Sequence, residues 1–214
     1  MSLKTKRIFM AFIGVIITGF CVGTIQKTTL GTDPFTCFVT GIANLFGSTY
    51  STFYLIVMAI ILIGVFIVEK HYIGVATVIN LLFTGAAADF MRGLWDMAFP
   101  QPSMAVRAGL LFLGVLGSCF SASLYFTADL GVSGYDAISL IAANKYKLLP
   151  FRFCRVASDS VCVIVGFLFH ANVGIGTVIT ALFMGPVIQW FNTHVSEPFL
   201  HGAAKSGAAG KNQG

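Results

Sequence analysis

Six long, strongly apolar segments dominate the sequence and limit what the chain can fold into. They are Ile8–Ile25, Phe53–Val68, Ile73–Phe90, Ala105–Phe126, Phe153–Phe169 and Val173–Phe191. At about 1.5 Å of rise per residue, segments of this length form helices of about 25 to 30 Å, close to the thickness of the hydrocarbon core of a membrane. Helices are expected because in lipid each backbone polar group must pair within its own segment.

The composition excludes an ordinary soluble domain. Of the 214 residues, 57% are hydrophobic and only 10% are charged, whereas about 25% of a soluble domain is charged. The net charge is +5, and the basic residues stand mostly between the apolar segments, where they determine topology. The sequence therefore predicts an integral membrane protein whose partner is the lipid bilayer, and it does not predict binding to nucleic acid.

The sequence also repeats itself at a shift of 100 positions, without a gap. Leu30-Gly31 matches Leu130-Gly131, and Thr77-Val78-Ile79 matches Thr177-Val178-Ile179. Between positions 7 and 86, 18 of the 80 aligned pairs are identical, and they include glycines and polar residues. A repeat of this length is the first feature to seek in a sequence, and it predicts two membrane units, residues 7–99 and 105–199.

Each unit contains a short segment between its long ones. The short segments, Pro34–Phe46 and Gly134–Asn144, follow polar breaks at Lys27–Asp33 and Thr127–Ser133. The pair Asp33-Pro34 and the matching Ser133 are typical of a helix start. A helix of about 12 residues reaches only about 18 Å. We therefore predict an all-α, polytopic transmembrane helix bundle with six full spans and two short or re-entrant helices, with eight spans as the open alternative.

The distribution of Lys and Arg predicts that both termini are cytoplasmic. With eight spans, ten basic residues lie inside and two outside, and with six spans the counts are nine and three. Both counts obey the positive-inside rule, so they do not determine the number of spans. Short segments that cross would make the units parallel, and segments that fold back would make them inverted. The Gly-, Ala- and Lys-rich tail, residues 200–214, is predicted to be a disordered cytoplasmic segment.

Charged residues inside the second unit are the strongest candidates for a site, because ionisable groups in spans are costly. Arg152, Arg155 and Asp159 share one helix face by their spacing. Asp136 lies near the start of the second short segment. An ion pair that only fixes packing is one interpretation. The other is a polar pocket for an anionic or zwitterionic solute, with Arg155 as its counter-ion.

The two breaks are a second candidate feature. Helix N-termini carry free N–H groups and a partial positive charge, and related broken helices that meet near the membrane centre form many transporter sites. Ordinary capped loops are the alternative interpretation. Together the two features give one set of candidate substrate-binding residues: Asp33, Asp136, Arg152, Arg155 and Asp159.

Sequence signatures of enzymes are missing. The chain has no P-loop, no GxSxG and no HExxH motif, and its five cysteines form no CxxC pair. We therefore predict no enzyme, no catalytic residue, no bound metal and no cofactor.

The repeated glycine and threonine positions carry a resemblance to a known family. Leu30-Gly31 with Gly74-Val75-Ala76-Thr77 and Gly85, and Leu130-Gly131 with Gly174-Ile175-Gly176-Thr177 and Gly185, resemble the YczE/YyaS/YitT group of bacterial membrane proteins over about residues 7–199. The resemblance implies a multi-pass protein of the bacterial cytoplasmic (inner) membrane. It implies no catalytic residue, because the function of this group is largely uncharacterised.

The functional prediction is a secondary transporter or permease of a small solute, with an anion as the candidate class and with the site between the two units. The alternative is a membrane-embedded accessory or sensor protein without transport activity. A lipid-modifying enzyme is less favoured. The sequence leaves open whether the protein forms a homo-oligomer.

Overall fold

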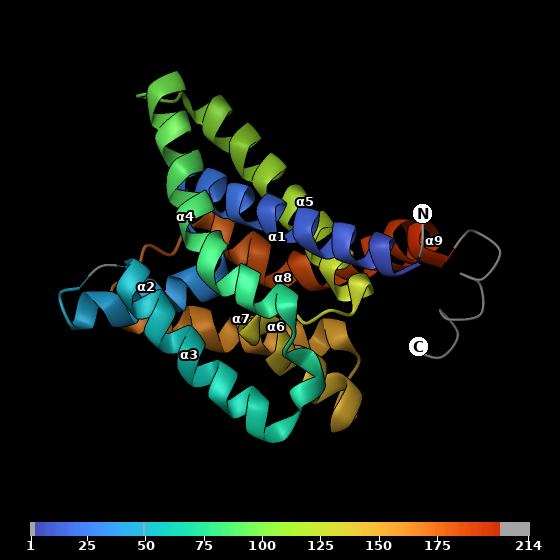
Figure 1. Ribbon diagram of the computed structural model, residues 1–214. Helices are drawn as coiled ribbons and strands as arrows, with labels where there is room; N and C mark the ends of the chain where they lie inside the picture. Colours follow the sequence, from blue (N-terminus) through green and yellow to red (C-terminus); the bar gives the residue numbers. More distant parts are fainter. Residues whose placement is uncertain (1–2, 49, 202–214) are drawn as a thin grey trace.

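The computed structural model describes residues 3–48 and 50–201, and every regular element within them is helical (Figure 1). The α-helices are α1 (Leu3–Thr28), α2 (Pro34–Leu45), α3 (Tyr50–Val68), α4 (Val75–Ala98), α5 (Met104–Ala128), α6 (Gly134–Leu140), α7 (Phe151–Leu168), α8 (Ile175–Phe191) and α9 (Glu197–His201). Shorter helical turns cover Lys70–Tyr72, Ile141–Lys145 and Asn192–Ser196. The predicted all-α fold class is confirmed, and the two short helices begin at the predicted residues.

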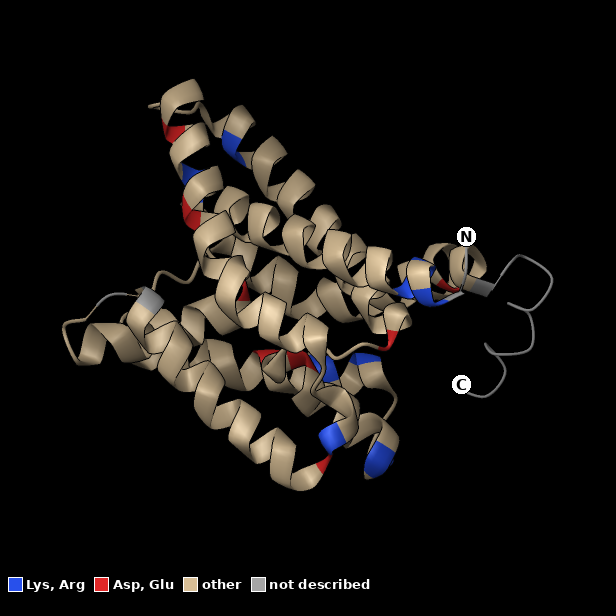
Figure 2. Ribbon diagram, viewed as in Figure 1, with Lys and Arg blue, Asp and Glu red and all other residues tan. Residues whose placement is uncertain are grey.

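The surface of the bundle suits hydrocarbon. Among the described residues, four helical stretches are long and apolar enough to cross a membrane: α1, α4, α5 and the stretch Ile175–Leu200, which contains α8 and most of α9. Large apolar side chains point outward, among them Ile67, which is 77% exposed, and Val75, which is 70% exposed. Figure 2 shows most of the Lys and Arg residues near the ends of the bundle and a few acidic residues in its middle. An apolar outer surface of this kind marks a membrane protein.

Helices α1 and α5 lie against each other in opposite directions (Figure 1). Gly14, early in α1, packs on Ser121 late in α5, while Gly114, early in α5, packs on Ile25 late in α1. The hydroxyls of Thr18 and Ser121 are hydrogen-bonded at 2.8 Å. Glycines at these positions let the two backbones approach closely, as is common between helices in membranes.

Helix α4 packs on α1 in the same direction as α1. Gly19 faces Ala87, and Gly23 faces the backbone of Ala88. Further along, the indole N–H of Trp95 donates to Thr24 Oγ1 over 2.9 Å. Because α1 and α4 run the same way, the chain must return between them, and α3 makes that return.

The breaks after α1 and α5 bond to the opposite half of the chain. The N–H of Gly176 at the start of α8 donates to Leu30 O at 2.9 Å, and the N–H of Ala76 at the start of α4 donates to Leu130 O at 3.1 Å. Gly31 and Gly131, which follow those carbonyls, have φ of +115° and +101°. Glycine tolerates this region of φ readily. Residues 100 positions apart thus make corresponding contacts.

The two short helices also pack on the opposite half. On one side, α2 lies along α7, where Gly41 packs on Gly166. On the other side, α6 lies on α3, where Gly134 packs on Met58 and Leu62. The contact of α2 with α7 is much more extensive than that of α6 with α3.

The start of α1 and helix α9 lie at the same end of the bundle (Figure 1). The Lys6 ammonium lies 5.8 Å from the centre of the Phe199 ring. Leu200 is buried, and together with His201 it completes α9. The rest of the predicted disordered tail, residues 202–214, lies outside the described residues.

Candidate functional site

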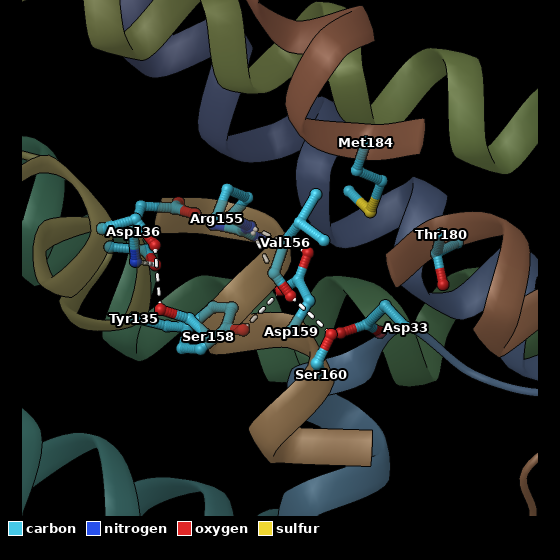
Figure 3. Close-up of polar contacts among 12 residues, drawn as sticks. Asp33, Tyr135, Asp136, Arg155, Val156, Ser158, Asp159, Ser160, Thr180 and Met184 are labelled. Atoms are coloured by element: carbon cyan, nitrogen blue, oxygen red, sulfur yellow. Dashed lines mark hydrogen bonds and ion pairs between the residues drawn. The ribbon is translucent and has the colours of Figure 1, made fainter. Parts of the chain in front are cut away.

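A buried cluster of three charged side chains forms where α6 meets α7. Arg155 and Asp159 are one turn apart on α7, and the Arg155 Nε lies 3.2 Å from Asp159 Oδ1. The other arm of the Arg155 guanidinium binds Asp136, in the first turn of α6. Arg155, Asp136 and Asp159 are 6%, 5% and 0% exposed. The spacing of four residues between Arg155 and Asp159 therefore predicted one part of this buried cluster (Figure 3).

Two tyrosines complete the cluster. The Tyr125 hydroxyl donates to Asp136, and the Tyr135 hydroxyl donates to Asp159. The Arg155 guanidinium carbon lies 4.5 Å from the centre of the Tyr135 ring, in a cation–π contact. Each carboxylate thus has both a cationic partner and a hydroxyl donor. Such pairing compensates the cost of taking the charges out of water.

A cavity of about 90 Å³ adjoins the cluster, and both short helices begin at it. From α2, Asp33 and Thr36 line it, and Asp33 Oδ1 accepts the Thr36 N–H at 3.0 Å. From the corresponding turn before α6, Ser133 and Asp136 line it, and Ser133 Oγ accepts the Asp136 N–H at 3.3 Å. The predicted caps at both helix starts are confirmed, and the two N-termini face one cavity.

Three polar atoms at this cavity are buried but have no hydrogen-bond partner among the described residues. They are the second carboxylate oxygen of Asp33, the hydroxyl of Thr84 on α4 and the hydroxyl of Ser118 on α5. Thr84 is only 5% exposed, and Asn80, one turn before it, is 4% exposed and also lines the cavity. Buried polar groups are nearly always paired in proteins. The cavity therefore offers hydrogen-bonding capacity that the protein itself does not use.

A much larger cavity, of about 800 Å³, opens beside the small one, and we call it the vestibule. Its lining includes Arg7 of α1 and Glu197 of α9, so it lies at the end of the bundle that holds the start of α1. At its rim, Asp129 lies 3.0 Å from His71 Nε2 and 3.9 Å from Arg7 Nη1. Ile188, only 1% exposed, lines both the vestibule and the small cavity.

The structure brings together four of the five residues selected from the sequence. Asp136, Arg155 and Asp159 form the cluster, and Asp33 lines the adjoining cavity. Arg152 lies apart from them: it is exposed, and its guanidinium carbon stands 4.9 Å from the centre of the Phe153 ring. Among the described residues, no group of three or more His, Cys, Asp or Glu side chains is arranged to hold a metal ion.

Sequence reasoning missed the two tyrosines of the cluster and the unpaired hydroxyl of Thr84. Tyr125 comes from α5 and Tyr135 from α6, whereas helical spacing relates only residues of one helix. The one available signal was a polar hydroxyl within an apolar segment, which usually needs a partner when buried.

The chain matches the model of a family of unknown function, DUF6198, over residues 5–193. An uncharacterised protein of Haemophilus influenzae is 29% identical over 188 residues, which cover 87% of this chain and 83% of the relative. From Bacillus subtilis, the uncharacterised membrane protein YczE is 22% identical over 183 residues, covering 84% of this chain and 82% of YczE. The uncharacterised protein YyaS of the same organism is 21% identical over 188 residues, covering 88% of this chain and 93% of YyaS.

These similarities confirm the resemblance to the YczE and YyaS group that the glycine and threonine positions indicated. The description of YczE as a membrane protein agrees with the apolar helices found here. No solved structure matches the chain.

Proposed function

The chain belongs to the family of unknown function DUF6198, and because this membership carries no activity with it, we propose from the site itself that the protein is a secondary transporter or permease of a small solute. The observation that carries the proposal is the small cavity. It holds charged and unpaired polar groups in the interior of a membrane protein and adjoins a wide vestibule. Polar groups in such a place are expensive and generally serve a pathway for ions or solutes.

The proposal includes an inverted relation between the two halves. The opposite directions of α1 and α5 support it, as do the reciprocal bonds from Gly176 to Leu30 and from Ala76 to Leu130. In this topology α1, α3, α4, α5, α7 and α8 cross the membrane, while α2 and α6 are short helices that begin at the cavity. Inverted halves around a central site, with short helices directed at it, are a common transporter design.

The unequal packing at the two ends supports alternating access. At the vestibule end, α6 makes few contacts with α3. At the opposite end, α2 is closed against α7, and a Cβ added to Gly41 would lie 2.9 Å from the Gly166 Cα. If α6 packed closely on α3 and α2 moved away from α7, the vestibule would close and the cavity would open to the other side of the membrane. With six spans, the excess of Lys and Arg supports a cytoplasmic location for the vestibule and both termini, in a bacterial inner membrane.

Transport can be tested in liposomes that contain the purified protein. Uptake of radiolabelled tetramethylammonium, glycine and succinate, which are a cation, a zwitterion and an anion, is compared with uptake by protein-free liposomes. We expect the wild type to take up at least one probe and Arg155→Ala to lose that uptake. Arg92→Ala, which removes an exposed arginine of α4, should retain it. Equal uptake by wild type and Arg155→Ala, or no uptake of any probe, would contradict the proposal.

One observation favours a second function, that of an accessory or sensor protein without transport activity. Arg155 is already bound by both Asp136 and Asp159 and has almost no exposed surface. An Arg155 side chain whose charge is already paired twice is typical of an ion pair that only fixes the packing of α6 on α7. In that case liposomes should take up none of the three probes although the protein is folded and monodisperse. For neither function do we propose enzymatic chemistry.

A further inference from the structure

The charges around the small cavity determine which solute it can accept. Three carboxylates, those of Asp33, Asp136 and Asp159, lie at or directly behind the cavity wall, against one guanidinium, that of Arg155. The other titratable side chains that line the cavity are tyrosines, which are neutral in their ordinary state. With its acids ionised, the site has an excess of negative charge.

Arg155 is not free to bind an anion. Its Nε bonds to Asp159 and its Nη1 to Asp136, and both bonds are buried. An anionic solute would add a further negative charge beside a guanidinium that two buried carboxylates already neutralise, which is unfavourable. The surroundings of Arg155 therefore argue against the anionic solute that the sequence suggested.

Asp33 is in the opposite situation. It forms no ion pair with any described residue: one oxygen caps α2, and the other is buried without a hydrogen-bond partner. Thr84, which is only 5% exposed, presents an unpartnered hydroxyl at the same cavity, independent of the acidic residues, and so does Ser118. An unpaired buried carboxylate oxygen is costly, and a ligand with a positive charge and N–H donors would remove that cost.

The remaining walls suit an organic cation. The rings of Phe35, Tyr54 and Tyr135 line the cavity. Phe35 stacks on Tyr135 with ring centres 4.8 Å apart and meets Tyr54 edge-on at 6.0 Å. Tyr135 already faces both Arg155 and Phe35, so these rings act as an apolar wall. Together with the side chains of Met58 and Met184 they leave room for a short alkyl group. A volume of about 90 Å³ limits the ligand to a few non-hydrogen atoms.

We propose that this cavity binds a small organic ammonium cation, with Asp33 as its counter-ion, Thr84 as a neutral acceptor and the aromatic rings around its alkyl group. The inference deepens the proposed function, since it names the class of solute that the transporter would carry. It is tested by binding, so its outcome does not depend on whether transport occurs.

The test is isothermal titration calorimetry on the full-length protein purified in detergent, with propylammonium chloride and sodium propionate as probes. These two ions are similar in size and opposite in charge. We expect saturable binding of propylammonium and none of propionate. Asp33→Asn should weaken propylammonium binding by about tenfold or more, which is a loss of one close charge interaction. Asn is also a good helix cap, so this variant should keep the fold of α2.

Asp96→Asn is the matched control, because Asp96 is an exposed carboxylate on α4 whose partner is Lys27, and it should bind propylammonium as the wild type does. The inference is overturned if propionate binds in place of propylammonium, if neither ion binds, if Asp33→Asn binds propylammonium unchanged, or if sodium chloride alone competes with it at equal concentration. Binding without uptake in liposomes would retain this site and remove the transport function. Uptake of succinate by a protein that binds no propylammonium would retain the transport function and remove this site.

Discussion

At the scale of single residues, Arg155 illustrates what a charged side chain requires inside a bilayer. Its guanidinium has two carboxylate partners and an aromatic face, and each carboxylate also receives a tyrosine hydroxyl. Removal of one partner from a buried ion pair leaves an uncompensated charge, which costs more than the intact pair contributes. Stability should therefore depend strongly on every member of this cluster.

Asp159→Ala tests this dependence. The substitution leaves Arg155 with Asp136 alone and removes the acceptor of the Tyr135 hydroxyl. We expect it to lower the free energy of unfolding by about 3 to 5 kcal/mol, measured by unfolding in detergent micelles followed by tryptophan fluorescence. Glu69→Ala removes one partner of an ion pair, that with Lys145, in which both side chains are well exposed, and it should leave the unfolding midpoint close to that of the wild type. Equal, small effects of both substitutions would mean that Asp159 is not ionised and paired as described.

These residues also show which contacts of the cluster could be predicted from the sequence and which could not. Arg155 and Asp159 were found together because a spacing of four places them on one face of α7. Asp136 was found because an acid in an apolar unit is rare. The partnership of Tyr125 with Asp136 could not be predicted, since it depends on how α5 packs against α6. Arg152 has the right spacing but sits at the first turn of α7, where its side chain reaches the surface.

At the scale of elements, the glycines at the starts of α4 and α8 hold the two halves together. A Cβ on Gly74 would lie 2.6 Å from the carbonyl carbon of Leu130, and a Cβ on Gly174 the same distance from that of Leu30. The sequence shows these glycines at matching positions of the two copies. It could not reveal that each packs on the other half, because a repeat carries no information about the direction of its copies.

Gly74→Ala should therefore disrupt the contact between the halves, whereas Gly93→Ala should not. Nothing lies within 4 Å of a Cβ placed on Gly93, in the same helix α4. We expect Gly74→Ala to destabilise the protein by about 1 to 3 kcal/mol through overpacking, and Gly93→Ala to stabilise it by about 0.5 to 1 kcal/mol through helix propensity. Unfolding in micelles measures both. Similar effects of the two substitutions would show that the break does not dock as closely as the contacts indicate.

At the scale of the whole molecule, the direction of the helices supports the proposed six spans over eight. Helices α1 and α4 run the same way with α3 returning between them, which agrees with three crossings in the first half of the proposed topology. The segment that joins α4 to α5 then lies at the end of the bundle opposite to the start of α1 and α9. If eight segments crossed in parallel units, that segment would lie on the same side of the membrane as both termini.

Cysteine labelling of the full-length chain distinguishes these two arrangements. In a background without the five native cysteines, Gln101→Cys marks the segment between α4 and α5, and Asn144→Cys marks the vestibule. With six spans and cytoplasmic termini, a membrane-impermeant maleimide should label Gln101→Cys on intact spheroplasts, while Asn144→Cys reacts only after permeabilisation. Eight spans place both cysteines in the cytoplasm, so neither would be labelled on intact spheroplasts. That outcome would remove the inverted relation of the halves and, with it, the structural basis for alternating access.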